Sequence, residues 1–524
     1  MKTKQVTLEE ALNLIPDGAN VAVSGFMLGC VPRELYVGIA DRFQKTGHPR
    51  GLTVMHAAGN GNNKDQGIID FSYEGLISRY ICGHYANNSR LIDLTNANKI
   101  TAYNFPQGVI AHMYRAAAAG KPGEITRIGL HTFCDPRLQG GKMNEVTKED
   151  LVELLHIDGE EYLLYKTPKL DIGLIRGTTA DEFGNITIEE EFAPLDALDI
   201  AMAVRTMGGK VIVQVKNVVS SKSMDRTKVL IPGNMVDAVV VSENPIENHR
   251  QTPGSFYDPV LAGHYQLDNV GFTSIPFDER KVIARRAAME LTPNSVVNLG
   301  IGIPEGVAAV ATEEGAGDQL LLTIESGLIG GIPTGGQNFG SAINAWAALP
   351  EASQFDYYNG GNLALTCLGF AEVDPTGNVN VSKFGSRIAG VGGFVDISQS
   401  TKTILFTGTM TAGGLKLAFE DGKLVIVQEG KKIKFKNNLD QVTFSSQFSK
   451  ETHQRVLFIT ERCVFQIVEE GLKLIEVAPG IDIEKDILPY MEFKPIIPEN
   501  VPLMDARIFR DEPMGLAEMI AAKA

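Results

Sequence analysis

A single glutamate stands where an apolar run gives way to glycine. The segment LLTIESGLIGGIPTGGQNFG (321–340) contains one carboxylate, Glu325, and six glycines between Glu325 and Gly340. The chain-wide frequency, 54 of 524, would give about 1.6 glycines in these 16 positions. Ordering such a segment costs roughly 0.5–1 kcal/mol per glycine relative to alanine. Because this cost has no evident structural return, the glycine-rich backbone indicates a function for the carboxylate.

This composition suits a nucleophilic carboxylate. A free glutamate has a pKa of about 4.3 and is ionised at neutral pH, so hydration, and not a proton, prevents its attack on an electrophile. Removal of water raises the pKa, and a rise of more than about 3 units would leave the group protonated. Glycine N–H groups could hold both the anion and a tetrahedral oxyanion, each donor contributing about 2.7–4 kcal/mol.

Two other interpretations of Glu325 remain open. The first is a structural acid at a strand end or a helix cap. The second is a dinucleotide-binding site, because VVNLGIGIPEG (296–306) predicts a strand, glycines and a helix, and an acid 25 residues after Gly300 could bind a ribose. The glycines there form GxGxxxG instead of GxGxxG, with Pro304 in the turn. The glycine excess after Glu325 favours the nucleophile.

The two halves of the chain contain the same order of predicted elements. TLEEALNLIPDGANVAVSG (7–25) and VIARRAAMELTPNSVVNLG (282–300) each predict a helix, a turn, a buried strand and a glycine. LDIGLIRGTTADEFGNI (170–186) aligns without gaps with LALTCLGFAEVDPTGNV (363–379). Two pairings in the same order indicate an internal duplication.

Strands that alternate with helices predict an α/β fold of two homologous open domains with mostly parallel sheets. Antiparallel hairpins are predicted near the C-terminus, in LKLAFEDGKLVIVQEG and RVLFITERCVFQIVEEGLKLIEV. We expect an N-terminal domain at 1–245, a linker at 246–275 and a C-terminal domain carrying Glu325 at 276–524. In the first half LTVMHAAGNG corresponds to LLLTIESG, so only one half has an acid at this strand tip, where parallel sheets bind ligands.

Composition argues against several classes of partner. A formal charge of −15, from 48 basic and 63 acidic residues, argues against nucleic acid and anionic membranes. The absence of a long apolar run or an apolar leader predicts a cytoplasmic protein. Five separated cysteines without CxxC, and nine histidines without HxH or HExxH, predict a reducing compartment and no metal site.

The segment IESGLIGG resembles the family I CoA-transferases, whose ExGxxGG pattern runs here from Glu325 to Gly331. The resemblance extends over essentially all 524 residues and is strong for the bacterial propionate/acetate CoA-transferase group. Further matching segments, in order, are SGFMLGCVP (24–32), NFPQG (104–108), FCDPRLQGGKMNEVTKEDLVEL (133–154), NLGIGIPE (298–305), GVGGFVDIS (390–398) and the tail ITERCVFQI…APGIDIEKDIL.

The resemblance implies transfer of CoA between a short-chain acyl-CoA and a short-chain carboxylate such as acetate, propionate, butyrate or lactate. Glu325 would attack the thioester to give a mixed anhydride and CoA thiolate, which would form a glutamyl-CoA thioester and release the acid. A second carboxylate would reverse these steps, which makes the mechanism ping-pong. No bound cofactor or metal is implied, CoA is a substrate, and relatives suggest a homotetramer.

The resemblance also assigns roles to residues outside the glutamate segment. The backbone amides of Gly393 and Phe394 are candidate oxyanion donors, and Gln107 is a candidate substrate contact. The asparagine-rich AGNGNN (58–63) lies where relatives place further polar contacts. The remaining assignments are Gly300, Gly302 and Gly392 on the CoA side, and Gly25, Phe26 and Met27 on the substrate side.

The bulk of Phe394, where ketoacid-specific relatives carry alanine, suggests a pocket for short acyl chains, as does Met27. Two other functions remain open. A non-catalytic CoA-binding protein on the same fold would have no activity to lose on removal of Glu325. A nicotinamide-dependent oxidoreductase would show a cofactor-dependent change in absorbance without CoA exchange.

Overall fold

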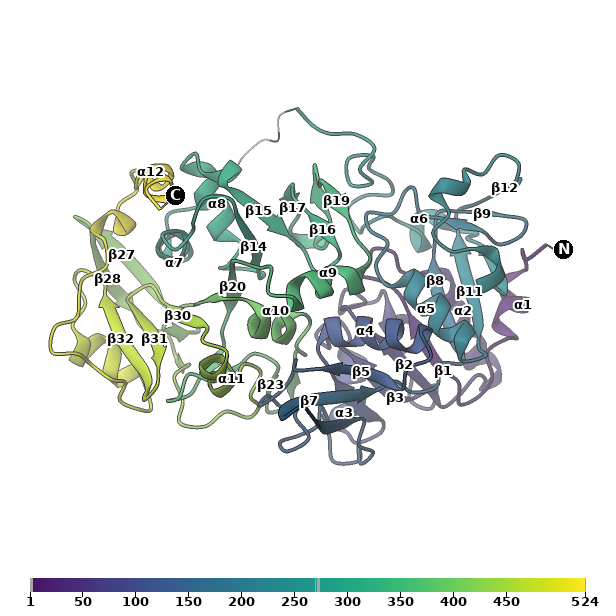
Figure 1. The fold of residues 1–524 in the computed structure, drawn as a ribbon, viewed down its shortest axis with the longest axis horizontal. Helices are drawn as coiled ribbons and strands as arrows, with labels where there is room; N and C mark the ends of the chain where they lie inside the picture. Colours follow the sequence, from purple (N-terminus) through teal and green to yellow (C-terminus); the bar gives the residue numbers. More distant parts are fainter. Residues whose placement is uncertain (1–2, 269, 271–273, 524) are drawn as a thin grey trace. The chain divides into compact units, whose positions relative to one another are not determined.

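The computed structural model describes residues 3–268, 270 and 274–523, which form two compact units. Unit 1 contains the residues up to Asp268 together with Ile324–Tyr357 and Gly385–Asp396, and unit 2 contains the remainder. Figure 1 shows the chain coloured from purple at the N-terminus to yellow at the C-terminus.

This division departs from the predicted domains. The first part of the predicted linker, 246–268, packs into unit 1, where His249 is 1% exposed. The segment that carries Glu325 also belongs to unit 1, although the prediction placed it in the C-terminal domain. Such packing arises from contacts between distant positions, for example the backbone bridge between Leu195 and Pro350, which local sequence does not encode.

A parallel sheet forms the core of unit 1, with its strands in the order β13-β11-β8-β1-β2-β3-β4. Every residue of β2 and β8 is buried, as expected for strands covered on both faces. The strands are β1 (Asn20–Val23), β2 (Leu52–His56), β3 (Ile77–Cys82), β4 (Thr101–Asn104), β8 (Ile172–Arg176), β11 (Lys210–Val215) and β13 (Ala238–Val241).

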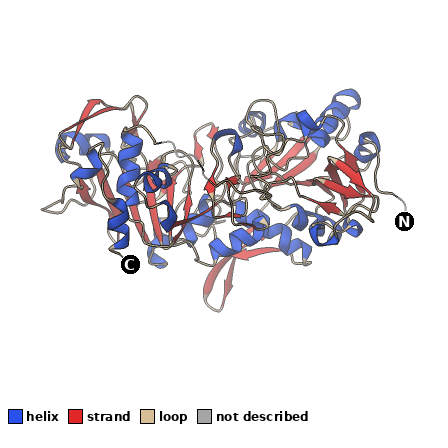
Figure 2. Cartoon of the chain, turned by 90° about the horizontal axis from the view of Figure 1, so that it is seen from above, coloured by secondary structure: helices blue, strands red, loops and turns tan. Residues whose placement is uncertain are grey.

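Helices cover both sides of this sheet, as Figure 2 shows in blue and red. The first begins with a capping box, in which the Thr7 hydroxyl accepts from the Glu10 N–H at 3.2 Å and the Glu10 carboxylate accepts from the Thr7 N–H at 2.9 Å. The helices are α1 (Leu8–Leu12), α2 (Arg33–Thr46), α3 (Ser89–Asn96), α4 (Gln107–Ala118), α5 (Ala197–Thr206) and α6 (Pro245–Asn248), and α9 (Glu351–Asn359) and α10 (Phe394–Ser400) also begin in unit 1.

Short strands complete unit 1. An antiparallel sheet is inserted between the two segments that the duplication matches, and two small ladders lie in the glycine-rich segment after Glu325. The inserted strands are β5 (Gly123–Thr126), β6 (Val152–Ile157) and β7 (Glu160–Lys166); β9 (Thr179–Asp181), β10 (Ile186–Thr187) and β12 (Asn217–Val219) form another sheet; the ladders are β16 (Leu328–Ile329) with β19 (Ala347–Ala348) and β17 (Ile332–Pro333) with β18 (Ala342–Ile343).

Unit 2 repeats the strand order of unit 1. Its strands run β15-β14-β20-β25-β30, all parallel, which is the order and direction of β2-β1-β8-β11-β13 in unit 1. The predicted duplication is thereby confirmed. The strands are β14 (Ser295–Leu299), β15 (Leu320–Thr323), β20 (Leu365–Gly369), β25 (Thr403–Thr407) and β30 (Arg455–Ile459).

The predicted C-terminal hairpins are also confirmed. β27 (Lys416–Glu420) and β28 (Lys423–Gln428) pair antiparallel through Asp421 and Gly422, both with positive φ. β31 (Cys463–Val468) and β32 (Gly471–Val477) extend the sheet of unit 2 beyond β30. The remaining short pairs are β21 (Glu372–Val373) with β22 (Val379–Asn380), β23 (Lys383–Phe384) with β24 (Arg387–Ile388), and β26 (Thr411–Ala412) with β29 (Lys432–Ile433).

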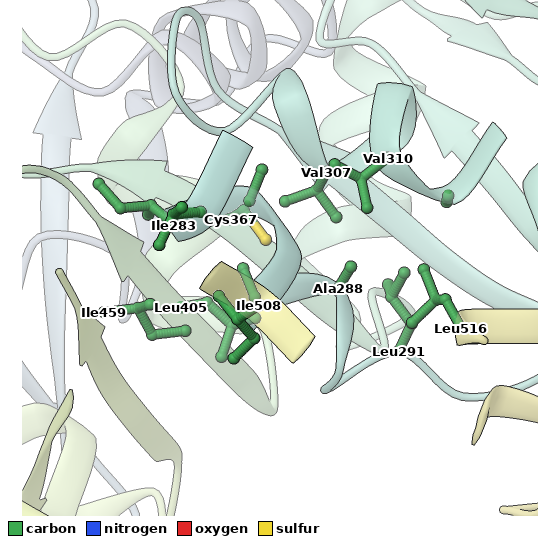
Figure 3. Packing of buried hydrophobic residues seen from close by; sticks show 14 of the residues in the cluster. Ile283, Ala288, Leu291, Val307, Val310, Cys367, Leu405, Ile459, Ile508 and Leu516 are labelled. Carbon is green, nitrogen blue, oxygen red and sulfur yellow. The ribbon is translucent and has the colours of Figure 1, made fainter. Parts of the chain in front are cut away.

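The hydrophobic core of unit 2 lies between its helices and its sheet. Figure 3 shows Ile283 of α7 (Glu279–Ala288) and Val307 of α8 (Gly306–Glu313) close to Cys367 of β20 and Leu405 of β25. Ile508, the neighbouring α12 (Leu516–Ala521) and the C-terminal segment close this cluster, while α11 (Ser446–Glu451) precedes β30. Within the described part of the chain, no helix has the length and apolar character needed to cross a bilayer.

Candidate active site

Glu325 lies in a tight turn directly after β15. The Ile324 N–H donates to the Leu328 carbonyl at 2.9 Å, and the Gly327 N–H donates to the Ile324 carbonyl at 3.0 Å. Ile324 and Leu328 are buried in an apolar cluster with Phe26, whereas Glu325 between them stays partly exposed. The turn is therefore fixed by its apolar neighbours and presents the carboxylate.

The glycines of this segment permit close packing. Gly327 has φ +108°, and a Cβ there would lie 2.0 Å from the Leu349 carbonyl oxygen. Gly340 has φ +103°, and its Cβ would lie 2.4 Å from a ring carbon of Phe26. A Cβ on Gly330 would lie 2.5 Å from Cγ of Trp346. The glycine excess noted in the sequence thus lets this backbone approach its neighbours within van der Waals contact.

Burial raises the pKa of Glu325 to about 7. The rise stays below the 3 units that would keep the group protonated at neutral pH. No described residue donates a hydrogen bond to its carboxylate, so the predicted backbone donors do not hold the anion in this state. Here the glycines supply space, while desolvation alone sets the protonation of the acid.

The backbone of the GVGGF segment approaches Glu325 at Gly393. A Cβ on Gly393 would lie 3.1 Å from Cγ and 3.2 Å from Oε1 of Glu325. The Gly393 N–H has no acceptor among the described residues, whereas the Phe394 N–H already donates to the Val391 carbonyl at 3.0 Å. Of the two predicted oxyanion donors, Gly393 is the unengaged one.

Hydrogen bonds fix the GVGGF segment on two other predicted elements. The Gly392 N–H donates to the Gly83 carbonyl at 2.8 Å, and the Gln107 N–H donates to the Gly392 carbonyl at 2.9 Å. The Gly108 N–H donates to Oδ2 of Asp396 at 3.1 Å. The start of α4 and the start of α10 thus hold each other, which places the NFPQG and GVGGF segments side by side.

Gln107 is buried and does not point to solvent. Its side-chain Nε2 donates to Oε1 of Glu351, the first residue of α9, at 2.6 Å. Burial raises the pKa of Glu351 well above its usual value, and the carboxylates of Asp196 and Glu325 raise it further. Nothing in the sequence singles out Glu351, because an acid in the first turn of a helix is ordinary.

A histidine without a predicted role, His84, also lies here. The ring Nδ1 of His84 lies 3.9 Å from the position of a Cβ on Gly392, and burial lowers the pKa of this histidine to about 4. His84 is therefore neutral at the site. A lone histidine without a partner at ligand spacing gave no signal in the sequence.

The substrate-side residues of the first half pack onto the Glu325 turn. Phe26 lies 5.8 Å from Phe339 between ring centroids and belongs to the same apolar cluster as Ile324. Met27 has φ +54°, and its N–H donates to the Gly59 carbonyl at 2.6 Å. The asparagine-rich segment is therefore hydrogen-bonded to the Met27 turn, and its contact with substrate stays a prediction.

Three further predicted residues, all glycines, have contacts within their own unit. Gly25 has φ +143°, and a Cβ there would lie 2.7 Å from Val31. Gly300 and Gly302 belong to unit 2, where the Gly300 N–H donates to the Cys367 carbonyl at 2.8 Å and Gly302 is exposed. The CoA-side roles of Gly300 and Gly302 stay predictions.

Comparison with known proteins gives full-length relatives. The chain is 46% identical over 511 residues to the acetate CoA-transferase YdiF of Escherichia coli O157:H7, covering 97% of this chain and 96% of the relative. It is 44% identical over 518 residues to the caffeate CoA-transferase of Acetobacterium woodii, covering 98% of each.

Solved structures agree with these relatives. A crystal structure of the acyl-CoA transferase YdiF from E. coli O157:H7, described as a thioester complex with CoA, has a TM-score of 0.91 and 45% identity and covers 98% of this chain and 97% of its own. The apoenzyme has a TM-score of 0.92 at the same identity and coverage. The family model for coenzyme A transferase matches residues 5–242 and 280–485. The chain belongs to the family I coenzyme A transferases.

Proposed function

We propose that this CoA-transferase uses Glu325 as its nucleophile and exchanges CoA between short-chain acyl-CoAs and short-chain carboxylates. The supporting observation is a carboxylate that burial alone brings to a pKa of about 7, next to the unengaged N–H of Gly393. Near neutral pH the Glu325 carboxyl then exchanges readily between its protonated and its ionised form, and the ionised form is the one that attacks a thioester.

The reaction proceeds in two halves. A carboxylate oxygen of Glu325 bonds to the acyl carbonyl carbon, the carbon–sulfur bond breaks, and the electron pair leaves as CoA thiolate. The thiolate attacks the glutamyl carbonyl of the mixed anhydride, giving a glutamyl-CoA thioester and the free carboxylate. The N–H of Gly393 would stabilise the oxyanion in these steps, a contribution of about 2.7–4 kcal/mol. A second carboxylate reverses the sequence.

The acids that we propose are acetate, propionate, butyrate and lactate. Sequence identity does not select among acids, because relatives named for acetate and for caffeate are about equally similar to this chain. The apolar cluster of Phe26, Phe339 and Ile324, with Met27 packed against it, supports short apolar acyl groups. One methylene changes binding by only about 1–3 kcal/mol, so a graded preference is expected within this series.

Trapping of the intermediate tests the nucleophile. The enzyme is incubated with acyl-CoA alone, and the intact mass is measured before and after treatment with borohydride or hydroxylamine. We expect one covalent CoA per chain, mapped by peptide analysis to Glu325 and absent in Glu325→Ala. Glu420→Gln, a change at an exposed acid of β27, is the matched control and should label normally. A CoA adduct on another residue would overturn the assignment.

We also infer a cytoplasmic homotetramer, on the basis of the resemblance to relatives. Light scattering of the purified protein should then give about four times the chain mass of 56.7 kDa. A mass of one or two chains at micromolar concentration would contradict the tetramer. The oxidoreductase and the non-catalytic CoA-binding protein are not favoured, because the full-length relatives are named as CoA-transferases.

A further inference from the structure

Glu351 carries an acid group that the proposed reaction does not use. The residue is 1% exposed, its Oε1 accepts from Gln107, and its Oε2 has no hydrogen-bond partner among the described residues. An unpartnered oxygen on a buried carboxylate is costly, because each unsatisfied polar group loses its hydration without compensation. A neutral carboxyl group lowers this cost, because an unpaired carbonyl oxygen loses less hydration than an unpaired carboxylate oxygen, and the proton can then lie on Oε1, the oxygen that meets Gln107.

The surroundings of Glu351 favour its neutral form. Burial raises its pKa most, the acids Asp196, Glu325 and Asp199 raise it further, and the hydrogen bond from Gln107 acts in the opposite direction. Tyr114 of α4 also lies near it and is kept neutral by burial. Within the described residues, Glu351 makes no ion pair with lysine, arginine or histidine. A buried carboxylate among other acids and without a cation is protonated rather than charged.

Nearby positive groups are directed elsewhere. Arg115 and His112 of α4 pair with Asp356, at 2.5 Å and 3.1 Å respectively. The guanidinium of Arg115 and the ring of His112 also lower the pKa of Asp199, although burial raises it overall. Arg115 and His112 therefore pair with Asp356 and act on Asp199, and neither is among the groups that shift the pKa of Glu351 most.

A neutral carboxylic acid and a primary amide can form two complementary hydrogen bonds. In one orientation of the amide, its N–H donates to the carbonyl oxygen of the acid. In the other, the O–H of the acid donates to the amide oxygen. A half-turn of the Gln107 amide group therefore decides whether its oxygen or its nitrogen faces away from Glu351. The Oε1 of Gln107 lies 3.7 Å from the position of a Cβ on Gly392, next to the Gly393 backbone that approaches Glu325. The side-chain atom of Gln107 that points away from Glu351 is therefore the one that lies nearest to the Gly392–Gly393 backbone.

We propose that Glu351 is a positioning residue whose protonated carboxyl donates to Oε1 of Gln107 and thereby turns the amide Nε2 toward the Gly392–Gly393 backbone. Nε2 then joins the Gly393 N–H as a donor to the oxygen of the substrate or of the Glu325 adduct. An ionised Glu351 would instead accept from Nε2 and leave Gln107 with a carbonyl oxygen facing a developing negative charge. This inference rests on the proposed role of Glu325.

The test measures the rate constant of CoA-adduct formation by rapid quench and intact mass in a double-mutant cycle of Glu351→Leu and Gln107→Leu. We expect Glu351→Leu to lower the rate constant 10- to 100-fold, about the loss of one poorly placed oxyanion donor, with a change in KM below about threefold. In the Gln107→Leu background the second substitution should have almost no further effect, because Glu351 acts through Gln107.

Glu351→Gln separates charge from shape. The glutamine amide can donate to Oε1 of Gln107, so this variant should recover most of the rate that Glu351→Leu loses. Its rate should also stay constant at high pH if the wild-type rate declines there. Additive losses in the cycle, or a Glu351→Gln variant as slow as Glu351→Leu with unchanged melting behaviour, would overturn the inference. Adducts mapped away from Glu325 in the wild-type enzyme would instead refute the proposed function.

Discussion

The ends of β2 and β15 occupy matching places in the two halves, but one ends in a buried apolar residue and the other in a partly exposed acid. Thr53 of β2 pairs with β1 at the position where Leu320 of β15 pairs with β14. Five residues further along the chain stand Ala58 in the first half and Glu325 in the second. Ala58 is 1% exposed and belongs to the apolar cluster, whereas Glu325 is partly exposed and accepts no hydrogen bond from any described residue.

At the first tip, packing buries Ala58 and hydrogen bonds engage both ring nitrogens of His56. The ring of His56 lies 2.6 Å from the Ala58 carbonyl through Nδ1 and 2.7 Å from the Tyr80 hydroxyl through Nε2. Burial lowers the pKa of His56 to about 4, so the ring is neutral. After duplication, one half uses this position for packing, whereas the other has an acid that accepts no hydrogen bond from the described residues, and this acid is the one that we propose as the nucleophile.

The largest effect is expected from moving the acid between the two tips. Glu325→Ala should reduce CoA exchange at least about 10³-fold, because no covalent intermediate forms without the nucleophile. Adding Ala58→Glu to this variant should restore no activity, because position 58 is closed by packing. The readout is CoA exchange between acyl-CoA and a labelled carboxylate, with folding checked by circular dichroism. Near-native exchange by Glu325→Ala would refute the distinction between the tips.

The second effect concerns stability and its dependence on pH. Burial raises the folded-state pKa of Glu325 from 4.5 to about 7, so the folded protein binds this proton more tightly than the unfolded chain. The cost of the charge is absent below about pH 4.5 and grows as the pH rises through 7. Glu325→Gln should therefore raise the free energy of unfolding by about 2–3 kcal/mol at pH 8, after allowance for partial exposure.

Urea titrations of Glu325→Gln and the wild-type protein at pH 8 and pH 5 measure this difference. The gain should shrink at pH 5, where the wild-type carboxyl is mostly protonated when folded. A gain of equal size at both pH values would show that the charge of Glu325 does not destabilise the fold. The exposed acid Glu420, changed to glutamine, should give no pH-dependent gain.

The third effect sharpens the role of the backbone next to Glu325. Gly393→Ala would place a methyl group 3.1–3.3 Å from Cγ, Cδ and Oε1 of Glu325 and displace the Glu325 side chain from its position. We expect the rate of adduct formation to fall about tenfold, with little change in melting temperature. Gly369→Ala, where nothing lies within 4 Å of the added Cβ, is the control. Equal rates of adduct formation for the two variants would show that the backbone at Gly393 does not affect the reaction of Glu325.

The smallest effect tests the duplication at a place where the halves agree. Asp181 accepts from the N–H groups of Phe183 and Asn185 at 2.9 Å each, and Asp374 accepts from those of Thr376 and Asn378 at 2.9 and 3.0 Å. Replacement of either aspartate by alanine should cost about 1–2 kcal/mol, in similar amounts. Urea denaturation measures both, and a cost confined to one half would contradict equivalent turns.

Features set by local sequence were predictable. The matching turns at Asp181 and Asp374, the alternation of strands and helices in both halves and the C-terminal hairpins follow from apolar periodicity and turn residues, which act over a few positions. Glu325 was found because its glycine excess is visible in one short segment. Its role as the nucleophile was implied by the resemblance, and remains a proposal.

Features set by long-range contacts were not predictable. The attachment of Glu351 to Gln107 joins positions 244 apart in the chain, and the approach of Gly393 to Glu325 depends on the bonds that hold α4 and α10 together. The unit boundary between Thr323 and Ile324 also depends on tertiary packing. No described N–H donates to the Glu325 carboxylate in this structure, although backbone donors were expected. Composition shows where glycine occurs, while the direction of its N–H groups depends on the folded turn.

The contact between Trp346 and Gly330 gives the molecule a built-in optical signal. Trp346 is the single tryptophan of the chain, is 73% exposed, and rests on the glycine-rich turn five residues beyond Glu325. Its emission therefore originates from one place, without background from other indoles. A stopped-flow fluorescence trace on mixing with acyl-CoA would report movement of this turn during a single turnover, in the unlabelled native enzyme.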